Sequence, residues 1–242
     1  MKTLVIIPTY NEIESLPRQI GGVRLTAPDA DILVVDDASP DGTGDWAEAK
    51  ANLDDHVYVM HRHAKQGLGV AYRSGFAWAL ERKYEVIVEM DADGSHRAQD
   101  LPSILAKAGE NDLVIGSRWV PGGHVENWPL HRKFLSTNAN RYVRVALGIA
   151  VKDATAGFRA YNAATLRQLD LDAVESQGYC FQVDMTWRTI LSGGRVVEVP
   201  ITFVERDLGA SKMSGAIIRE ALTKVTVWGI QRLWRKITRK DR

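Results

Sequence analysis

Residues 86–96 read VIVEMDADGSH, and this stretch sets the expectation for the rest of the chain. The apolar run 86–88 has the character of a buried strand, and two carboxylates, Asp91 and Asp93, follow it almost at once. Carboxylates at the end of a strand in an α/β protein point into the crevice where ligands bind. Such a pair suits Mg²⁺ or Mn²⁺, which often bridge to substrate phosphates. A solvated acidic turn is the alternative, because Asp-x-Asp alone is a weak signal.

The same arrangement recurs along the first half of the chain. Apolar runs expected to be strands alternate with segments expected to be helices; the strands lie at 4–7, 32–35, 57–60, 86–90 and 113–115, and the helices start near 13 and cover 46–53, 67–80 and 101–108. This alternation indicates βαβ units, and therefore an α/β fold with a mostly parallel sheet sandwiched by helices. Polar segments follow four of these strands: PTYNE (8–12), DDASPDGT (36–43), DADGSH (91–96) and GSR (116–118). We therefore expect their side chains at one edge of one sheet.

The second half of the chain is less regular. Residues 131–147 are expected to form a helix, and residues 195–204 alternate as a strand does. The chain ends in RLWRKITRKDR (232–242), which follows apolar positions at helical spacing and holds six basic residues and one acid. A basic amphipathic helix with tryptophan can lie in a membrane interface, and an ordinary terminal helix is the alternative. We predict one catalytic domain over residues 1–212 and a basic amphipathic helical segment over 213–242.

The overall composition excludes several classes of protein. The 31 Lys and Arg residues balance 30 Asp and Glu residues, so no global field favours nucleic acid as a partner. The single cysteine, Cys180, excludes an internal disulfide and a multi-cysteine zinc site. The start of the chain does not read as a signal peptide, and no window supplies the roughly 18 uncharged apolar residues that span a bilayer. We expect a cytoplasmic protein with one surface on a membrane.

Charged residues at the expected sheet edge suit a nucleotide diphosphate. Asp37 follows the second strand and lies, by this interpretation, near a base or ribose, while Asp91 and Asp93 act through a metal that neutralises a departing diphosphate. Arginine suits bidentate recognition of phosphate. The cations that form a candidate phosphate site are Arg118, Arg132, Lys133, Arg159, Arg206 and Lys212. Each of them taken singly is better explained as a surface charge.

Several segments in order resemble one known family. They are PTYNE, DDASPDGTG, KQGLG, DADGSH, GSR, DATAGFR and FVERDLGASK, and together they cover roughly residues 3–212. The chain resembles the polyprenol-phosphate mannosyltransferases, that is, the dolichol-phosphate mannose synthases and their bacterial relatives. These are inverting glycosyltransferases of the GT-A fold. PTYNE and Asp-x-Asp are shared by a wider superfamily, whereas SPDGT, GFR and R-x-x-G-x-SK in this order are more specific.

The resemblance implies GDP-mannose as donor, a polyprenyl phosphate as acceptor, and Mg²⁺ or Mn²⁺ as cofactor. Residues carried over to the nucleotide pocket are Pro8, Tyr10, Glu12, Val35 and Asp37. Those carried over to the metal and diphosphate are Asp91, Ala92 and Asp93. The resemblance implies that Arg118 faces the phosphates or the sugar, that Arg132 and Ser136 receive the acceptor phosphate, and that Arg206 and Lys212 close over the donor.

The chain departs from its relatives at two points. Some relatives have glutamine where Ser95 stands, which leaves a third protein ligand for the metal open. Some relatives carry transmembrane anchors and this sequence shows none. The resemblance therefore implies that the basic tail, or a separate membrane-anchoring protein, holds the enzyme at the lipid surface.

Three other functions remain open at this level. A glucosyltransferase that uses UDP-glucose and the same lipid would need similar residues. EMDADGS also matches the Asp-x-Asp-Gly-Ser/Thr pattern of haloacid-dehalogenase-like phosphatases, with Asp91 as nucleophile and Asp93 as acid/base. Against this reading, that motif normally follows the first strand, and here about ninety residues precede it. The third alternative is a non-catalytic, membrane-associated scaffold that binds a nucleotide sugar.

Overall fold

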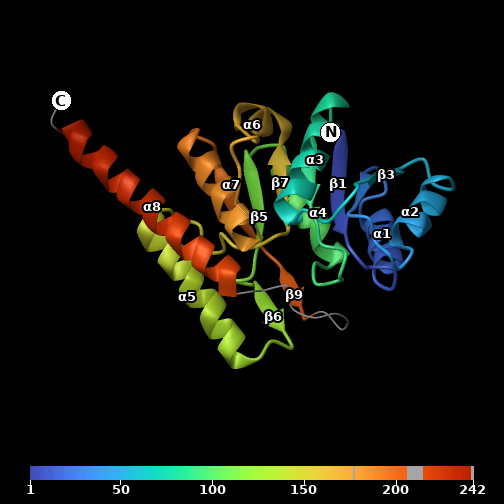
Figure 1. The fold of residues 1–242 in the computed structure, drawn as a ribbon, viewed down its shortest axis with the longest axis horizontal. Helices are drawn as coiled ribbons and strands as arrows, with labels where there is room; N and C mark the ends of the chain where they lie inside the picture. Colours follow the sequence, from blue (N-terminus) through green and yellow to red (C-terminus); the bar gives the residue numbers. More distant parts are fainter. Residues whose placement is uncertain (177, 206–214, 241–242) are drawn as a thin grey trace.

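The computed structural model describes residues 1–176, 178–205 and 215–240 of the chain, and it is built around one large sheet (Figure 1). The strands are β1 (Thr3–Thr9), β2 (Asp31–Asp36), β3 (Val57–His61), β4 (Val86–Glu89), β5 (Leu113–Ser117), β6 (His124–Glu126), β7 (Arg159–Asn162), β8 (Val196–Pro200) and β9 (Thr202–Val204). The helices are α1 (Leu16–Thr26), α2 (Thr43–Ala51), α3 (Leu68–Glu81), the short 3₁₀ helix η1 (Ala98–Asp100), α4 (Leu101–Ala108), α5 (Leu130–Leu147), α6 (Ala163–Gln168), α7 (Tyr179–Leu191) and α8 (Gly215–Lys240).

The seven strands of the large sheet follow the order β3-β2-β1-β4-β7-β5-β8. All neighbouring pairs are parallel except those of β7, which runs antiparallel to both β4 and β5. The sheet is therefore mostly parallel, and the α/β class expected from the alternation of strands and helices is confirmed. The first five predicted strands all form, in the predicted places.

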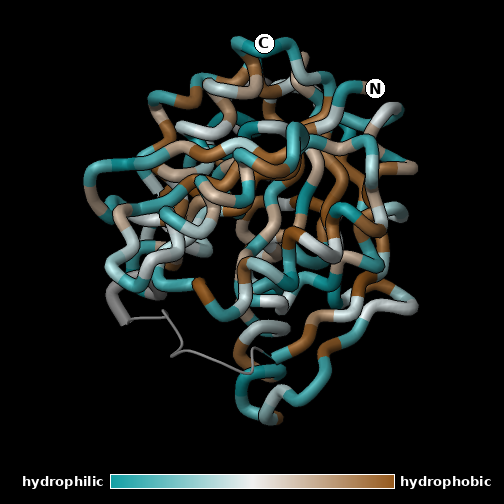
Figure 2. The backbone as a smooth tube through the Cα atoms, turned by 90° about the vertical axis from the view of Figure 1, so that its right-hand side faces the viewer, coloured by the Kyte–Doolittle hydropathy of each residue, from teal (hydrophilic) through white to brown (hydrophobic). Residues whose placement is uncertain are grey.

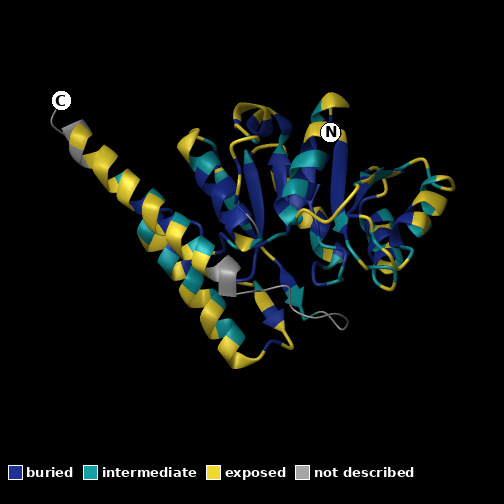
Figure 3. Ribbon diagram, viewed as in Figure 1, coloured by how far each residue is buried: buried dark blue, intermediate teal, exposed yellow. Residues whose placement is uncertain are grey.

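Alternating side chains of β1 explain why helices cover both faces of the sheet. Leu4 and Ile6 belong to a core with α3, α5, α6, α7 and α8, whereas Val5 and Ile7 belong to a second core with α1, α2 and α4. All four side chains are fully buried. Figure 2 shows the hydrophobic stretches concentrated inside the molecule, and Figure 3 shows the central strands of the large sheet as its most buried part. Each such side chain contributes about 1.5–3 kcal/mol to folding.

One predicted strand, 195–204, is wrong as a single element. The chain forms β8 in the large sheet and then β9, which pairs with β6 in a separate two-stranded sheet. Between them, the Ile201 N–H donates to the Ser117 carbonyl at 3.1 Å, and the Ile201 side chain packs over Gly116. The strand therefore changes sheets at this point, although its alternating pattern continues. The short elements β7, α6 and α7 were also not predicted.

The basic segment at the end of the chain forms helix α8, which packs on α5 and α7 (Figure 1). Val225 is buried in the core, and at Gly229 an added Cβ would lie 2.9 Å from the Ala146 carbonyl oxygen, so α5 and α8 are in close backbone contact. No helix within residues 1–176, 178–205 and 215–240 combines the length and apolar character that a bilayer span needs. The predicted domain boundary at 212/213 lies outside the described residues, so the division of the chain stays a prediction.

Candidate functional site

A cleft of about 360 Å³ opens at the carboxyl edge of β1, β2 and β4, where the sequence predicted the nucleotide site. The predicted residues that line it are Pro8, Tyr10, Glu12, Asp37, Asp91, Ala92, Asp93 and Arg118. Val35 does not line it, because this side chain is fully buried in the core below. The strand ends thus bring together seven of the eight residues expected at the donor and metal sites within 1–93, with Arg118 from β5 beside them.

Two loops, after β1 and β2, are held together by Asp36 rather than by Asp37. The Thr9 hydroxyl donates to Asp36 Oδ1 at 2.9 Å, and the Ser39 hydroxyl donates to the same oxygen at 2.6 Å. Asp37 is left to line the cleft, where Arg62 Nη1 donates to Asp37 Oδ1 at 2.6 Å. Burial raises the pKa of Asp37 above its usual value, although Arg62 opposes this shift. The acidic pair therefore has one structural and one site-facing member.

The turn after β4 is built to present two carboxylates. The Asp91 N–H donates to His96 Nδ1 at 3.0 Å, and the Ser95 N–H donates to Asp93 Oδ1 at 3.0 Å. Gly94 has a φ of 78°, a conformation that favours glycine and closes the turn. The Tyr72 hydroxyl donates to Asp91 Oδ1 at 3.4 Å from α3. Both carboxylates line the cleft beside the expected diphosphate position.

These residues fit a divalent cation that shares its coordination with a substrate. Among the described residues, no three His, Cys, Asp or Glu side chains cluster as a complete metal cage. Two neighbouring carboxylates suit Mg²⁺ or Mn²⁺, which commonly complete their shell with phosphate oxygens and water. The buried His96 ring accepts the Asp91 N–H through Nδ1 and stacks on Phe158, so this nitrogen is already used within the protein.

Arg159 is wrong as a member of the predicted phosphate site. Its side chain is fully buried, and its guanidinium donates to the carbonyls of Ala154, Ala156 and Gln182 at 2.6–2.8 Å. All three guanidinium nitrogens of Arg159 therefore donate hydrogen bonds inside the protein, and the side chain does not line the cleft. Glu89 lies in the same interior, and burial raises the pKa of its carboxyl to about 8.

Arg118 is held at the end of β5 by Asp153. The Asp153 carboxylate accepts hydrogen bonds from the Arg118 N–H, Nε and Nη2 at 2.6–2.9 Å, and Thr155 accepts a further one from Nη2. Arg118 Nη1 makes no hydrogen bond within the described part of the chain. Asp153 therefore fixes one edge of the Arg118 guanidinium, and the other edge faces the cleft that this side chain lines. The structural role of Asp153, within DATAGFR, was not predicted.

A second, smaller pocket of about 140 Å³ lies between α5, α7 and α8 and shares Arg118 with the cleft. Most of its lining is apolar, from Leu135, Ala139, Val143, Val183, Leu222 and Val225. Arg132 and Ser136, one helical turn apart on α5, also line it, as predicted for an acceptor phosphate. Arg132 forms an ion pair with Glu205. Lys133, by contrast, is not part of this lining.

Two predicted residues, Arg206 and Lys212, lie outside the described residues. Other residues line the sites without having been predicted: Lys65, Thr155, Tyr179 and Gln182. Lys65 Nζ lies 3.9 Å above the centre of the Tyr10 ring. Tyr179 lines both the cleft and the apolar pocket from the first turn of α7. The apolar positions of α7 are a signal that would have revealed this helix.

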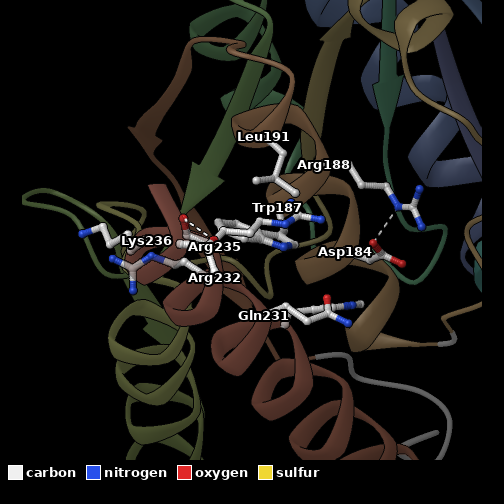
Figure 4. A pocket seen from close by; sticks show the side chains of 10 residues that line it. Asp184, Trp187, Arg188, Leu191, Gln231, Arg232, Arg235 and Lys236 are labelled. Carbon is white, nitrogen blue, oxygen red and sulfur yellow. Dashed lines mark hydrogen bonds and ion pairs between the residues drawn. The ribbon is translucent and has the colours of Figure 1, made fainter. Parts of the chain in front are cut away.

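A third hollow of about 840 Å³ separates α7 from the outer part of α8 (Figure 4). Arg232, Arg235 and Lys236 line it from α8, and Trp187 and Arg188 line it from α7. Arg188 is paired with Asp184, as the dashed line in Figure 4 shows. The lining of this hollow includes cationic and aromatic side chains. It shares no lining residue with the cleft or with the apolar pocket.

Comparison with known proteins places this arrangement in a family. The sequence description of glycosyl transferase family 2 matches residues 4–170. The chain belongs to this family. An undecaprenyl-phosphate mannosyltransferase of Micrococcus luteus is 60% identical over 234 residues, which cover 97% of this chain and 96% of that protein. A polyprenol monophosphomannose synthase of Mycolicibacterium smegmatis is 58% identical over 232 residues, which cover 95% and 88%.

Two solved enzyme structures share the fold of this chain at low sequence identity. Glucosyl-3-phosphoglycerate synthase from Mycobacterium tuberculosis, in complex with Mn²⁺, UDP and phosphoglyceric acid, matches with a TM-score of 0.72 at 17% identity and covers 94% of this chain and 78% of that one. A mannosyltransferase from Pyrobaculum calidifontis, in complex with GDP-Man and Mn²⁺, matches with a TM-score of 0.60 at 18% identity and covers 97% and 64%. The predicted GT-A fold of glycosyl transferase family 2 is confirmed, and the Asp-x-Asp after β4 rather than β1 agrees with it and not with the phosphatase alternative.

Proposed function

We propose that this chain transfers mannose from GDP-mannose to a polyprenyl phosphate with inversion, giving polyprenyl β-mannosyl phosphate and GDP. The observation that carries the proposal is that Arg118 lines both the polar cleft and the apolar pocket. A substrate with a phosphate head and a hydrocarbon chain fits a cationic position next to an apolar pocket. The mannosyltransferases of 60% and 58% identity support the same reaction.

The donor side of the reaction belongs to the cleft. Pro8, Tyr10, Glu12 and Asp37 line the position proposed for the nucleotide, with Asp37 toward the base or ribose. Asp91, Ala92 and Asp93 lie where the diphosphate is expected. Val35 would act only from the core beneath the nucleotide, since its side chain is buried.

The Asp91 and Asp93 carboxylates would hold a divalent cation at the position proposed for the donor diphosphate. When bound, Mg²⁺ or Mn²⁺ would act as a Lewis acid that stabilises the charge of the departing diphosphate. The chain's own contribution is to fix the turn, through the bond from the Asp91 N–H to His96, and the two carboxylates. The Tyr72 hydroxyl donates to the Asp91 carboxylate, and the Ser95 N–H donates to the Asp93 carboxylate. Ready-made geometry of this kind avoids reorganisation during the reaction.

The acceptor phosphate is proposed to lie among Arg118, Arg132 and Ser136. A phosphate oxygen is already anionic, so it attacks the anomeric carbon without a strong general base. Arg118 is fixed by Asp153 and offers its remaining edge to the reaction. Positioning and electrostatic stabilisation then account for most of the rate. Arg206 and Lys212 keep the roles proposed from the resemblance, on the donor side, with Arg206 also near the acceptor phosphate.

We place the chain on the cytoplasmic face of a membrane, with residues 1–212 as the catalytic domain and 213–242 as the part that meets the lipid. Exposed apolar side chains on the two outer helices support this: Leu130, Phe134 and Val145 on α5, and Ile230, Leu233 and Trp234 on α8. Arg235 and Lys236 lie beside them. Cytoplasmic leaflets carry anionic lipids that attract such clusters. A separate membrane-anchoring protein that covers α8 is the other arrangement proposed.

The deciding experiment measures sugar transfer to a polyprenyl phosphate from labelled GDP-mannose, with Mg²⁺, with Mn²⁺ and with EDTA. UDP-glucose runs in parallel. Metal-dependent labelled lipid from GDP-mannose is the expected result. Label from UDP-glucose alone would keep the mechanism and change the sugar. Absence of labelled lipid from both donors, together with tight donor binding, would contradict the proposed transfer and favour a scaffold.

A further inference from the structure

Trp128 contacts both of the arginines that are proposed to bind the acceptor phosphate. It belongs to the connection between β6 and α5 and is only 8% exposed. The guanidinium carbon of Arg132 is 4.0 Å from the centre of the Trp128 ring, and that of Arg118 is 5.5 Å from it. All three side chains line the apolar pocket. One indole therefore contacts cations that come from two different elements, β5's end and α5.

Holding two guanidinium groups close together is unfavourable before an anion arrives. Each has a carboxylate on one side, Asp153 for Arg118 and Glu205 for Arg132. An aromatic ring attracts a cation through its negative face. Unlike a further carboxylate, the ring attracts the cations without adding negative charge that would repel a phosphate.

The surroundings of Trp128 show which part of the indole is used. Its Nε1–H is buried and has no hydrogen-bond partner within the described residues. Its ring meets the Phe203 ring edge-to-face at 5.4 Å, and Phe203 meets His96 in the same way at 5.5 Å. Phe203 and His96 both line the donor cleft. The packing against Phe203 thus fixes the orientation of the Trp128 ring. The polar contacts of this side chain are those of its ring face with the two arginines, and not a hydrogen bond from Nε1–H.

We propose that Trp128 is a positioning residue of the acceptor site, whose ring contacts both Arg118 and Arg132 and holds them for the phosphate head of the lipid. The proposal rests on the function proposed above, because that function supplies the anion. It adds a residue that lines the apolar pocket and does not line the cleft proposed for the donor. Its effect is expected in acceptor binding and in turnover, with donor binding unchanged.

The experiment compares binding and turnover of farnesyl phosphate in the full chain and in the variants Trp128→Phe and Trp128→Leu. Calorimetry without donor gives the acceptor affinity, and steady-state transfer gives KM for each substrate. We expect about tenfold weaker binding of farnesyl phosphate for Trp128→Leu. The loss should be smaller for Trp128→Phe, because a phenyl ring also attracts cations, although less strongly than an indole does. Farnesol, which has the same tail and no phosphate, tests whether the loss concerns the pocket instead.

A series of fluorinated tryptophans placed at position 128 isolates the electrostatic part, because fluorine weakens the negative face and keeps the shape and N–H. Farnesyl phosphate affinity that falls stepwise with fluorination supports the proposal. A flat series, or an equal loss for farnesol and farnesyl phosphate, would overturn it. The binding readout does not need transfer, so a chain that binds farnesyl phosphate through Trp128 but transfers no mannose would contradict the proposed function alone.

Discussion

The polar cleft at the ends of β1, β2 and β4 and the apolar pocket between α5, α7 and α8 share Arg118, yet they are built in different ways. In the cleft, most of the predicted residues come from the ends of β1, β2 and β4, which the parallel sheet brings together. In the pocket, side chains from three helices far apart in the sequence meet through packing. The first kind of site can be recognised from motifs, whereas the second depends on how the helices pack.

The largest expected effect separates the two regions through Asp93. Asp93→Ala should lower transfer by about a thousandfold or more, because it removes one of two carboxylates placed for the metal. Affinity for farnesyl phosphate without donor should stay unchanged, since Asp93 does not line the apolar pocket. Transfer kinetics, calorimetry and the melting temperature check this.

Asp93→Asn is the matched variant, because its amide oxygen still accepts the Ser95 N–H. It should bind the metal weakly and keep the turn. Full activity of Asp93→Ala with an unchanged melting temperature would refute the metal assignment.

The next effect tests the pocket through two neighbours on α5. Arg132→Ala should raise the acceptor KM about 10- to 100-fold, as expected for the loss of a charge-assisted hydrogen bond, and leave the donor KM unchanged. Lys133→Ala is the control, since Lys133 carries the same charge but does not line the pocket. Steady-state kinetics with each substrate varied in turn measures both constants. Equal effects of the two variants would mean that only the general charge of α5 matters.

A third test asks whether the basic end of α8 binds a lipid surface. Arg235→Glu with Lys236→Glu should weaken binding to vesicles of phosphatidylcholine and phosphatidylserine about tenfold, because each cation near such a surface contributes favourably. Truncation of residues 230–242 should act in the same direction. Vesicle sedimentation at two salt concentrations measures it.

The matched control reverses two exposed cations elsewhere, Lys107 on α4 and Arg167 on α6. This variant has the same net charge as the first. If both bind vesicles equally well, the tail serves packing or a protein partner instead of lipid.

The smallest effect concerns Glu205, which pairs with Arg132. Glu205→Gln should lower the acceptor KM about two- to fivefold, since a carboxylate that competes with the phosphate for this guanidinium is neutralised. Glu126→Gln on β6 is the control, because Glu126 contacts His124 and does not contact Arg132. Acceptor titrations at fixed donor measure the change. A higher KM in Glu205→Gln would show instead that Glu205 holds Arg132 in place.

The sequence predicted the donor side well because its chemistry follows strands. Asp37, Asp91 and Asp93 could be placed at one edge from their positions after apolar runs alone, whereas Arg132 and Ser136 needed a family resemblance. Arg159 was misjudged because a charged residue inside a loop-like stretch gives no sign that carbonyls will surround it. Val35 was placed by the resemblance at a position whose side chain points into the core.

The prediction of β7 and of the separate strands β8 and β9 failed for a related reason. β7 is only four residues long, Arg159–Asn162, and its pattern is too short to distinguish from a loop. Residues 195–204 alternate throughout, and alternation does not tell which sheet a strand joins. Partners distant in the sequence decide both outcomes, and a single sequence does not name them.

The reversed direction of β7 has a consequence for the spacing of the reaction centre. Neighbouring strands lie about 4.8 Å apart, so the insertion of β7 between β4 and β5 separates their ends by about 9.6 Å. Because β7 starts at this edge, it is the segment before the strand, with Asp153 and Thr155, that reaches the site. The strand thus works as a spacer between the turn after β4, which carries Asp91 and Asp93, and Arg118 at the end of β5.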